Sequence, residues 1–423
     1  MRKWYSLIDK VYKVENLRQA FKAVKANKGA PGIDGETVEA FEAKEEENIS
    51  KLHEELKTGI YQAQPVRRVY IEKDDGTRRP LGIPTVRDRV VQQALKSVIE
   101  PIFEPKFHPS SYGYRPGKSC QRAIAKAERF MNKYGLEYVV DMDLSKCFDS
   151  LDHELILKSV NKEISDGKVL KLILNFLKSG VMEGWVHTET EVGCPQGGPI
   201  SPLLMNIYLN ECDQRMKDKG IRIVRYADDI LVLAKNKGEA GRNMKVAAEI
   251  LEGDLKLKIN KEKTHTVNIE QGIAYLGVII YPKFIEIHPK RLAKFKNKIK
   301  ELTKRNQGIN LEQVIEEINP VIRGWANYFR IANSEGTFKS LMGWIRRRLR
   351  MKKMIEWKTW KPLHKQLRRM GYSGHFKKIY VKRWRNSASP LVQMALPNSW
   401  FDEMKLVNMT KIKTGNLPCY YEI

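Results

Sequence analysis

The chain carries two kinds of hydrophobic pattern, and they predict different secondary structure. In residues 17–24 and again in residues 292–357, apolar side chains recur every three or four positions, as on an amphipathic helix. Three helices are expected after residue 281, namely 292–302, 311–329 with an interruption near Pro320, and 338–357. Between residues 138 and 234, short apolar runs without that spacing are typical of buried strands. The pattern therefore predicts a mixed α+β part followed by a helical part.

Two adjacent carboxylates, Asp228 and Asp229, stand between the apolar runs 221–225 and 230–233. These flanks predict a β-hairpin with the aspartates at its turn. Aspartate is common at turns because its side chain bonds the local backbone, so a solvated tight turn is the alternative. Two anions beside buried strands repel each other and lose hydration, however, and a bound cation such as Mg²⁺ removes that cost. The hairpin therefore indicates a divalent metal site.

A second acidic strand is expected upstream, at residues 138–144. The period of two along a strand puts Asp141 and Asp143 on one face and apolar residues on the other. Asp143 is the expected third metal ligand. Asp149 and Asp152 precede an apolar helical run, and there they fit a helix-capping role better.

Composition indicates a polyanionic partner independently of these motifs. The chain has 76 Lys and Arg against 50 Asp and Glu, a net charge of +26. The excess concentrates in residues 341–385, which hold sixteen basic residues and one acidic residue, interleaved with tryptophan. A solvated charged face with the tryptophans in a core is the alternative. The expected nucleic-acid contacts in this region are Arg346, Arg347, Arg348, Lys352, Lys353, Lys382, Arg383 and Arg385.

Five segments, in order, resemble the motifs of the group II intron-encoded reverse transcriptase/maturase family. The acidic strand followed by Cys147-Phe148-Asp149 resembles motif A, with Asp143 five residues before Phe148. Segments 195–204, 226–229, 257–264 and 275–277 resemble motifs B, C, D and E. One such motif would be weak evidence, whereas five in the right order are specific.

The resemblance implies an α+β, right-hand polymerase with fingers, a palm built on an antiparallel sheet, a helical thumb and a small basic C-terminal region. The implied boundaries are 1–35 for an N-terminal extension, 36–120 for the fingers, 121–280 for the palm, 281–370 for the thumb or maturase domain X, and 371–423 for a reduced DNA-binding region.

The activity that the resemblance implies is RNA-directed DNA synthesis, in which a DNA or RNA primer is extended with dNTPs on an RNA template. Asp143, Asp228 and Asp229 are the implied catalytic residues and metal ligands. They would hold two Mg²⁺ ions, for which Mn²⁺ could substitute, and these ions stabilise the attacking and leaving oxygens of phosphoryl transfer.

Further residues acquire roles through the same resemblance. In the predicted hairpin 71–84, Lys73 and Arg79 would grip the triphosphate, with a solvated surface hairpin as the alternative. Phe148 would exclude a 2′-hydroxyl unless it is an ordinary core aromatic. Lys263 would protonate pyrophosphate unless it is simply exposed.

Four more residues are expected beside the template or the nascent base pair. Gln196 could hydrogen-bond near the templating base, and Gly197 and Gly198 carry no side chain to obstruct a base pair; a plain loop before a helix at 203–209 is the alternative. Tyr112 and Arg115 suit stacking and phosphate contact along the template, although a structural turn is the competing interpretation.

The implied partners are the group II intron RNA, whose splicing the protein would assist, and target DNA. No nuclease signature follows residue 371, so an endonuclease domain is expected to be absent and the primer source stays open. Two alternatives remain: an intron-independent reverse transcriptase, either phage-defence or domesticated, and an RNA-binding splicing cofactor with a vestigial polymerase site. Five widely spaced cysteines predict the free thiols of a cytosolic protein, and the lack of a long apolar segment predicts a soluble protein with no membrane partner. The resemblance implies a cytoplasmic ribonucleoprotein of bacteria.

Overall fold

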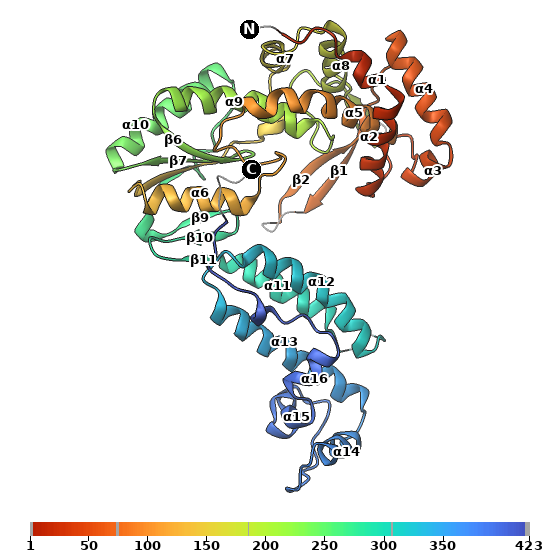
Figure 1. The fold of residues 1–423 in the computed structure, drawn as a ribbon, viewed down its shortest axis with the longest axis vertical. Coiled ribbons are helices and arrows are strands. Elements are labelled where there is room, and N and C mark those ends of the chain that lie inside the picture. The colour runs from red at the N-terminus through yellow and green to blue at the C-terminus, as the bar shows by residue number, and fades with distance from the viewer. Residues whose placement is uncertain (1–2, 73–75, 185, 306–307, 419–423) are drawn as a thin grey trace. The chain divides into compact units, whose positions relative to one another are not determined.

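A computed structural model describes residues 3–72, 76–184, 186–305 and 308–418 of the chain (Figure 1). These residues form two compact units, the first up to Asn268 and the second from Ile269 onward. The first unit mixes helices with two sheets, and the second joins a small sheet to a run of helices. The predicted α+β class is confirmed. The finer boundaries of fingers, palm and thumb stay predictions.

The first unit contains ten α-helices and eight strands among its described residues. The helices are α1 (Ile8–Tyr12), α2 (Val14–Ala26), α3 (Val38–Ala43), α4 (Glu45–Thr58), α5 (Val86–Phe103), α6 (Cys120–Asn132), α7 (His153–Asn161), α8 (Gly167–Leu177), α9 (Ser201–Asp218) and α10 (Lys237–Ala248). The strands are β1 (Val66–Glu72), β2 (Arg78–Ile83), β3 (Tyr138–Met142), β4 (Val181–Glu183), β5 (Val186–Thr188), β6 (Arg222–Tyr226), β7 (Asp229–Ala234) and β8 (His265–Asn268).

Two four-stranded sheets organise this unit. One has the strand order β2-β1-β4-β5, and the other has the order β6-β7-β3-β8 with antiparallel neighbours. Helices α6, α9 and α10 pack against the second sheet (Figure 1). Helices cover the two central strands, β3 and β7, so most of their side chains are buried and apolar. Val140, Leu231 and Val232 are fully buried. This sheet carries the predicted acidic strand and the predicted hairpin.

Local sequence signals explain where several helices begin. The side chain of Asp152 accepts a hydrogen bond from the amide of Leu155 at the start of α7, which confirms the predicted cap. Helix α9 begins at Ser201 with Pro202 in its first turn, where a missing N–H costs nothing. It confirms the helix predicted at 203–209 and extends it to Asp218.

The second unit begins with a three-stranded antiparallel sheet and continues as helices. Its strands are β9 (Ile273–Tyr275), β10 (Val278–Ile280) and β11 (Ile285–Ile287). Its helices are α11 (Pro289–Leu302), α12 (Leu311–Phe329), α13 (Glu335–Glu356), α14 (Lys361–Arg369), α15 (Pro390–Ala395) and α16 (Asn398–Glu403), with short 3₁₀ turns η5 (Trp384–Ala388) and η6 (Met409–Lys411). The three helices expected after residue 281 are therefore present as α11, α12 and α13.

The predicted interruption at Pro320 is wrong, because α12 continues through it. Proline removes one backbone hydrogen bond from a helix, but Pro320 and Glu316 both lie on the exposed side, where water can satisfy the freed carbonyl. The opposite face of α12 is held by the indole of Trp325, which stacks on Phe295 with ring centroids 4.3 Å apart.

Two global expectations can be compared with the described residues. None of their helices is long and apolar enough to cross a membrane. Within the same residues the cysteines, Cys120, Cys147, Cys194 and Cys212, are free thiols, as predicted.

Candidate active site

The Asp228-Asp229 pair lies at the tip of the predicted hairpin. Strands β6 and β7 are antiparallel neighbours, with Tyr226 paired to Asp229, so only Ala227 and Asp228 form the turn. Ala227 adopts a left-handed conformation (φ 59°), which lets so short a turn match the twist of its strands. Asp228 is partly buried and Asp229 is exposed. The turn therefore presents both carboxylates at one end of the sheet.

Strand β3 brings Asp143 to the same end of the sheet. It pairs antiparallel with β7, with Asp141 opposite Leu231 and Met142 opposite Ile230. One further step in this register puts Asp143 opposite Asp229, at a separation of about 5 Å between the Cα atoms of paired residues. Residues 143, 228 and 229 are thus neighbours in space although about 85 positions separate them in the chain.

The segment after α10 also contacts Asp143, through Asn260 and Lys263. Asn260 donates a side-chain hydrogen bond of 3.1 Å to Asp143 Oδ2, and its backbone amide donates to the carbonyl of Asp143. Lys263 Nζ lies 3.7 Å from the same Oδ2. The ammonium of Lys263 therefore lies beside the acidic centre and is 64% exposed, and its predicted role as a proton donor to pyrophosphate stays a prediction.

The carboxylates influence one another strongly. Partial withdrawal from water, followed by the negative charges of Asp228, Asp141 and Asp143, raises the pKa of Asp229 to about 7, and Lys263 opposes that rise. Burial also raises the pKa of Asp141. Unneutralised carboxylates at this density favour a bound cation.

The donor set suits Mg²⁺, which prefers carboxylate oxygens and keeps several water ligands. Among the described residues, no group of three or more His, Cys, Asp or Glu side chains is placed so that together they could hold a metal ion. Asp143 is hydrogen-bonded to Asn260 and turned toward Lys263. The residues therefore fit a cation held mainly by water and substrate oxygens, with few protein ligands.

A buried ion pair supports the aspartate turn from behind. Arg225 is fully buried on β6, and its Nε donates hydrogen bonds of 2.9 Å to both carboxylate oxygens of Asp213 on α9. Its Nη1 donates to Asn206 Oδ1 at 2.9 Å and to the carbonyl of Ala227 at 3.0 Å. Because the last contact reaches the residue beside Asp228, Arg225 fixes the position of the turn.

The loop after η1 (Glu104–Lys106) also packs on this turn. The backbones of Ser110 and Tyr112 exchange hydrogen bonds with the backbone of Arg225. A Cβ atom added at Gly113 would lie 2.3 Å from the amide nitrogen of Ala227. Only glycine allows the two backbones to approach this closely.

We expect Gly113→Ala to lower both stability and nucleotide incorporation. The new methyl group overlaps backbone atoms next to Asp228, so either the loop or the turn must move, at a cost of about 1–3 kcal/mol. Thermal unfolding and single-nucleotide incorporation measure the two effects. Gly241→Ala on α10 is the matched control, because its Cβ would meet no atom within 4 Å. An unchanged incorporation rate in Gly113→Ala would show that this loop does not position the turn.

The predicted nucleotide-binding residues Arg79 and Gln196 lie together. Arg79, exposed on β2, donates from Nε to Gln196 Oε1 at 2.9 Å. The carbonyl of Gln196 accepts from the amide of Gly82 on the same strand. Gly197 has φ 129°, and a Cβ there would lie 2.3 Å from the carbonyl oxygen of Gly82. The lack of a side chain at Gly197 therefore lets this loop pack against β2. The predicted role beside a base pair is a separate requirement.

Two other predicted nucleotide contacts have different outcomes. Phe148 lies in the 3₁₀ turn η2 (Cys147–Ser150), is only 5% exposed and belongs to the hydrophobic core, so a contact with ribose stays a prediction. Gly198 is buried, with Gln92 Oε1 2.4 Å from its would-be Cβ. Lys73 lies outside the described residues.

Tyr112 and Arg115 are not available to a template, and those predictions are wrong. Tyr112 is 1% exposed. The guanidinium of Arg115 is buried and donates to Glu104 and to the carbonyls of His108 and Ser111. Both side chains hold the loop together, which is the structural turn that the sequence left open.

The basic residues predicted for nucleic acid in the second unit have several distinct environments. Arg348 donates to Thr303 Oγ1 at 2.6 Å and to carbonyls at the end of α11, so it caps that helix. Lys352 is buried, which contradicts a surface contact there, and Lys353 pairs with Glu356 at 3.0 Å. The remaining candidates split into two groups. Arg346 and Arg347 line a cavity, whereas Lys382, Arg383 and Arg385 are exposed.

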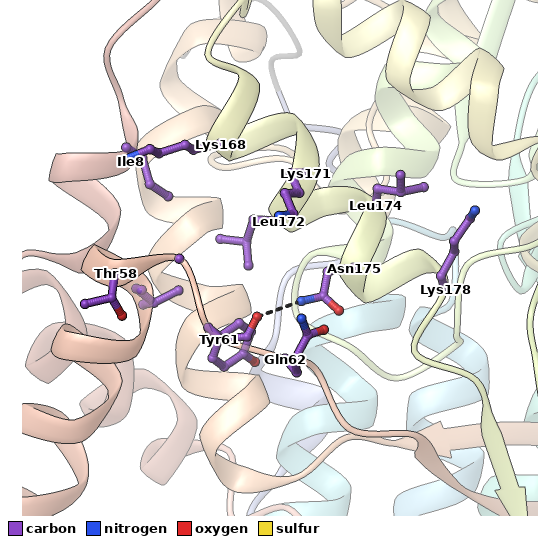
Figure 2. Close-up of a pocket in the computed structure, with 12 residues that line it drawn as sticks. Ile8, Thr58, Tyr61, Gln62, Lys168, Lys171, Leu172, Leu174, Asn175 and Lys178 are labelled. Carbon is purple, nitrogen blue, oxygen red and sulfur yellow. Dashed lines mark hydrogen bonds between the residues drawn. The ribbon is translucent and has the colours of Figure 1, made fainter.

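A cavity of about 500 Å³ in the first unit contains none of the predicted site residues (Figure 2). Helix α8 contributes Lys168 and Lys171, the residue after it is Lys178, and the segment after α4 contributes Tyr61 and Gln62. The amide of Asn175 donates to the carbonyl of Tyr61 across one wall. None of the described residues that line this cavity is acidic, so they offer no carboxylate for a catalytic metal.

Sequence reasoning missed two residues that organise the acidic centre. Asn260 lies inside the segment 257–264 that resembles motif D, but the sequence does not show that its amide contacts Asp143. Arg225 carried a usable signal, since a charged residue inside a buried apolar strand requires a buried partner. The partner, Asp213, is twelve residues upstream on another element, so only the fold identifies it.

Comparison with known proteins gives two family matches. The family described as reverse transcriptase (RNA-dependent DNA polymerase) matches residues 71–280, and the group II intron maturase-specific domain matches residues 292–372. The chain is 35% identical over 263 residues to protein YkfC of Escherichia coli (strain K12), covering 53% of this chain and 69% of YkfC.

The chain is also 32% identical over 297 residues to the group II intron-encoded protein LtrA of Lactococcus lactis subsp. cremoris, covering 55% of this chain and 49% of LtrA. The match therefore spans about half the length of LtrA. Among solved structures, telomerase from Candida albicans in complex with a fragment of telomeric RNA has a TM-score of 0.44 at 12% identity, covering 81% of this chain and 67% of that one.

Proposed function

Because the chain belongs to the reverse transcriptase family and carries a group II intron maturase-specific domain, we propose that it extends a primer with dNTPs on an RNA template at Asp143, Asp228 and Asp229. The observation that carries this proposal is the register of β3 and β7, which puts the first carboxylate opposite the other two. Enzymes of this family use divalent metal ions, and the all-oxygen donor set fits Mg²⁺.

In this proposal, the protein contributes mainly position and charge. Divalent cations bound at the three carboxylates would activate the primer 3′-hydroxyl and neutralise the charge that develops on the phosphates. Arg225 and Asp213 keep the turn fixed, and Asn260 orients Asp143. Lys263 holds an ammonium beside Asp143, from which it can give a proton to the leaving pyrophosphate.

Arg79 and Gln196 would receive the incoming nucleotide. A guanidinium can bind two phosphate oxygens at once, and the hydrogen bond from Arg79 to Gln196 limits the freedom of both side chains. The hydrogen bond from the amide of Gly82, on the strand that carries Arg79, to the carbonyl of Gln196 links the residue expected at the triphosphate to the one expected at the base. The two elements would therefore position one nucleotide between them.

We expect Arg79→Gln to raise the KM for dNTP about tenfold, with a smaller effect on kcat. The reason is the loss of a charged contact to the triphosphate. Steady-state incorporation at varied dNTP concentration measures it. Arg78→Gln is the matched control, because Arg78 is the preceding exposed residue and points to the other face of β2. Equal effects of the two changes would mean that only the general positive charge matters.

The experiment that tests the proposed activity compares templates. The full chain is given a DNA primer annealed to an RNA template or to a DNA template of the same sequence, with dNTPs and Mg²⁺. We expect extension on the RNA template, and loss of extension when EDTA removes the metal. Absence of extension on the RNA template would refute the proposed activity. Absence of extension on both templates would favour an RNA-binding splicing cofactor.

The maturase-specific match at residues 292–372 supports a second role, binding of a group II intron RNA to assist its splicing. Exposed Lys382, Arg383 and Arg385 would add nonspecific phosphate contacts to RNA or target DNA. An intron-independent reverse transcriptase remains the alternative. Splicing of a group II intron that flanks the gene, with and without the protein, distinguishes the two.

A further inference from the structure

The second unit contains a cavity of about 570 Å³ between α13 and the segment from η5 to η6. Helix α13 contributes Lys339, Gly343, Arg346, Arg347 and Arg350 to its wall, together with Glu335. The other wall consists of neutral polar and small residues, including Ser387, Asn398 and Thr410. The cavity is therefore polar and strongly basic on one side.

Two of its arginines are buried, at 9% exposure for Arg346 and 7% for Arg350. Arg350 has protein partners, since it donates to the carbonyl of Leu396 at 2.9 Å and to Asn398 Oδ1 at 3.0 Å. It also lies over the ring of Phe401. Arg350 thus has a structural role in closing the cavity wall.

Arg346 is less well satisfied. Its nearest carboxylate is Asp402, 4.0 Å away, and Asp402 is shared with Lys411 at 3.7 Å. Within the described residues, the buried Nε atoms of both Arg346 and Arg347 have no hydrogen-bond partner. Arg347 lies over the indole of Trp384, 4.8 Å from its centroid. A buried guanidinium N–H without an acceptor is costly, and an anion that accepts from it would remove that cost.

The charge balance supports the same conclusion. Among the described residues, four basic side chains line the cavity against the one carboxylate of Glu335. Burial, followed by the charge of Arg346, lowers the pKa of Arg350 to about 10, so the cations repel one another across the wall. Converging guanidinium groups are the usual protein ligand for phosphate oxygens.

We propose that this cavity is a phosphate-binding site that takes one backbone phosphodiester of bound RNA, with Arg346 and Arg347 as its main ligands. The inference rests on the proposed RNA-binding function and assigns it a discrete location. A volume of about 570 Å³ exceeds what an inorganic phosphate needs and lies in the range of sites that hold a nucleotide-sized ligand.

Three variants separate a built site from general positive charge. Arg346→Gln removes the central cation. Gly343→Met leaves every charge in place but fills the cavity, because a Cβ at Gly343 meets no atom within 4 Å and methionine is the better helix former. Arg369→Gln removes a charge from the exposed end of α14 and does not line the cavity.

The probe is a fluorescein-labelled RNA hairpin with a single-stranded flank, titrated with the full-length protein at several salt concentrations. We expect Arg346→Gln and Gly343→Met each to weaken binding about tenfold. Arg346→Gln should also reduce the salt slope by about 1, whereas Arg369→Gln should change affinity less than about twofold. Wild-type affinity in Gly343→Met, or equal losses in Arg346→Gln and Arg369→Gln, would overturn the proposal.

Two further measurements assign the ligand and separate this proposal from the proposed function. Inorganic phosphate should not raise the Tm of the wild-type protein selectively over Arg346→Gln. A selective rise would identify free phosphate as the ligand and overturn the RNA assignment. Primer extension by the wild-type protein is measured in parallel. Its absence would refute the polymerase function, whereas extension by the wild type together with wild-type RNA affinity in Gly343→Met would overturn only the cavity proposal.

Discussion

Asp228→Asn is expected to reduce primer extension by about a thousandfold or more while the protein stays folded. The amide keeps the size of the side chain but removes a negative charge that a divalent cation requires. Because the carboxylate of Asp228 raises the pKa of Asp229, removing it also relieves repulsion at the turn. The melting temperature should therefore stay the same or rise. Single-turnover incorporation on an RNA template and thermal unfolding measure the two effects.

The matched control for this change is Asp218→Asn, which removes a carboxylate from the exposed end of α9. It should leave the incorporation rate within about twofold, since surface charges away from a site have small effects. Retention of activity in Asp228→Asn would contradict the assigned site. Loss of activity together with unfolding would indicate a structural role for Asp228.

Arg225→Met is expected to have the largest effect on stability, a loss of about 3–5 kcal/mol in the free energy of unfolding. The substitution leaves the carboxylate of Asp213 buried, at 1% exposure, with no compensating cation. It also removes donors from Asn206 and from the carbonyl of Ala227, so incorporation should fall even where the protein remains folded. Urea unfolding measures the loss of stability, and nucleotide incorporation at low temperature measures the loss of activity in the folded protein.

The double variant Arg225→Met/Asp213→Leu tests the stated cause. Replacing both members of a buried ion pair by apolar residues avoids an unpaired charge, so stability should return by more than half. Incorporation should stay low, because the hydrogen bond to Ala227 is still missing. A double variant as unstable as Arg225→Met would show that the charge of Asp213 is not the source of the loss.

Patterns of short range predicted most of the acidic centre. Apolar runs on both sides of Asp228 and Asp229 specify a hairpin, and period-two alternation puts Asp143 on the acid face of its strand. What the sequence could not supply is the register between β3 and β7, which brings the two segments together. The sequence nevertheless predicted that the two segments meet, because the five motifs occur in the order found in the family.

The failures share a physical cause, which is that side-chain type does not determine exposure. Tyr112 and Arg115 are typical nucleic-acid-binding residues, yet the backbone of the loop that contains them bonds to β6, and both side chains are buried. The basic stretch in α13 is similar. Helical periodicity turns Arg346 and Lys352 inward while Arg348 reaches the end of α11. A count of charges along the sequence does not show which of these basic side chains face the interior and which face solvent.

The measurement that most directly tests the central claim is metal-directed cleavage of the protein. Fe²⁺ replaces Mg²⁺ in the full chain bound to primer, RNA template and a dNTP, and ascorbate with peroxide then generates radicals that cut the backbone near the metal. We predict cuts beside Asp143 and in the turn at Asp228 and Asp229, lost on addition of excess Mg²⁺. Mg²⁺-sensitive cuts confined to other parts of the chain would contradict the account.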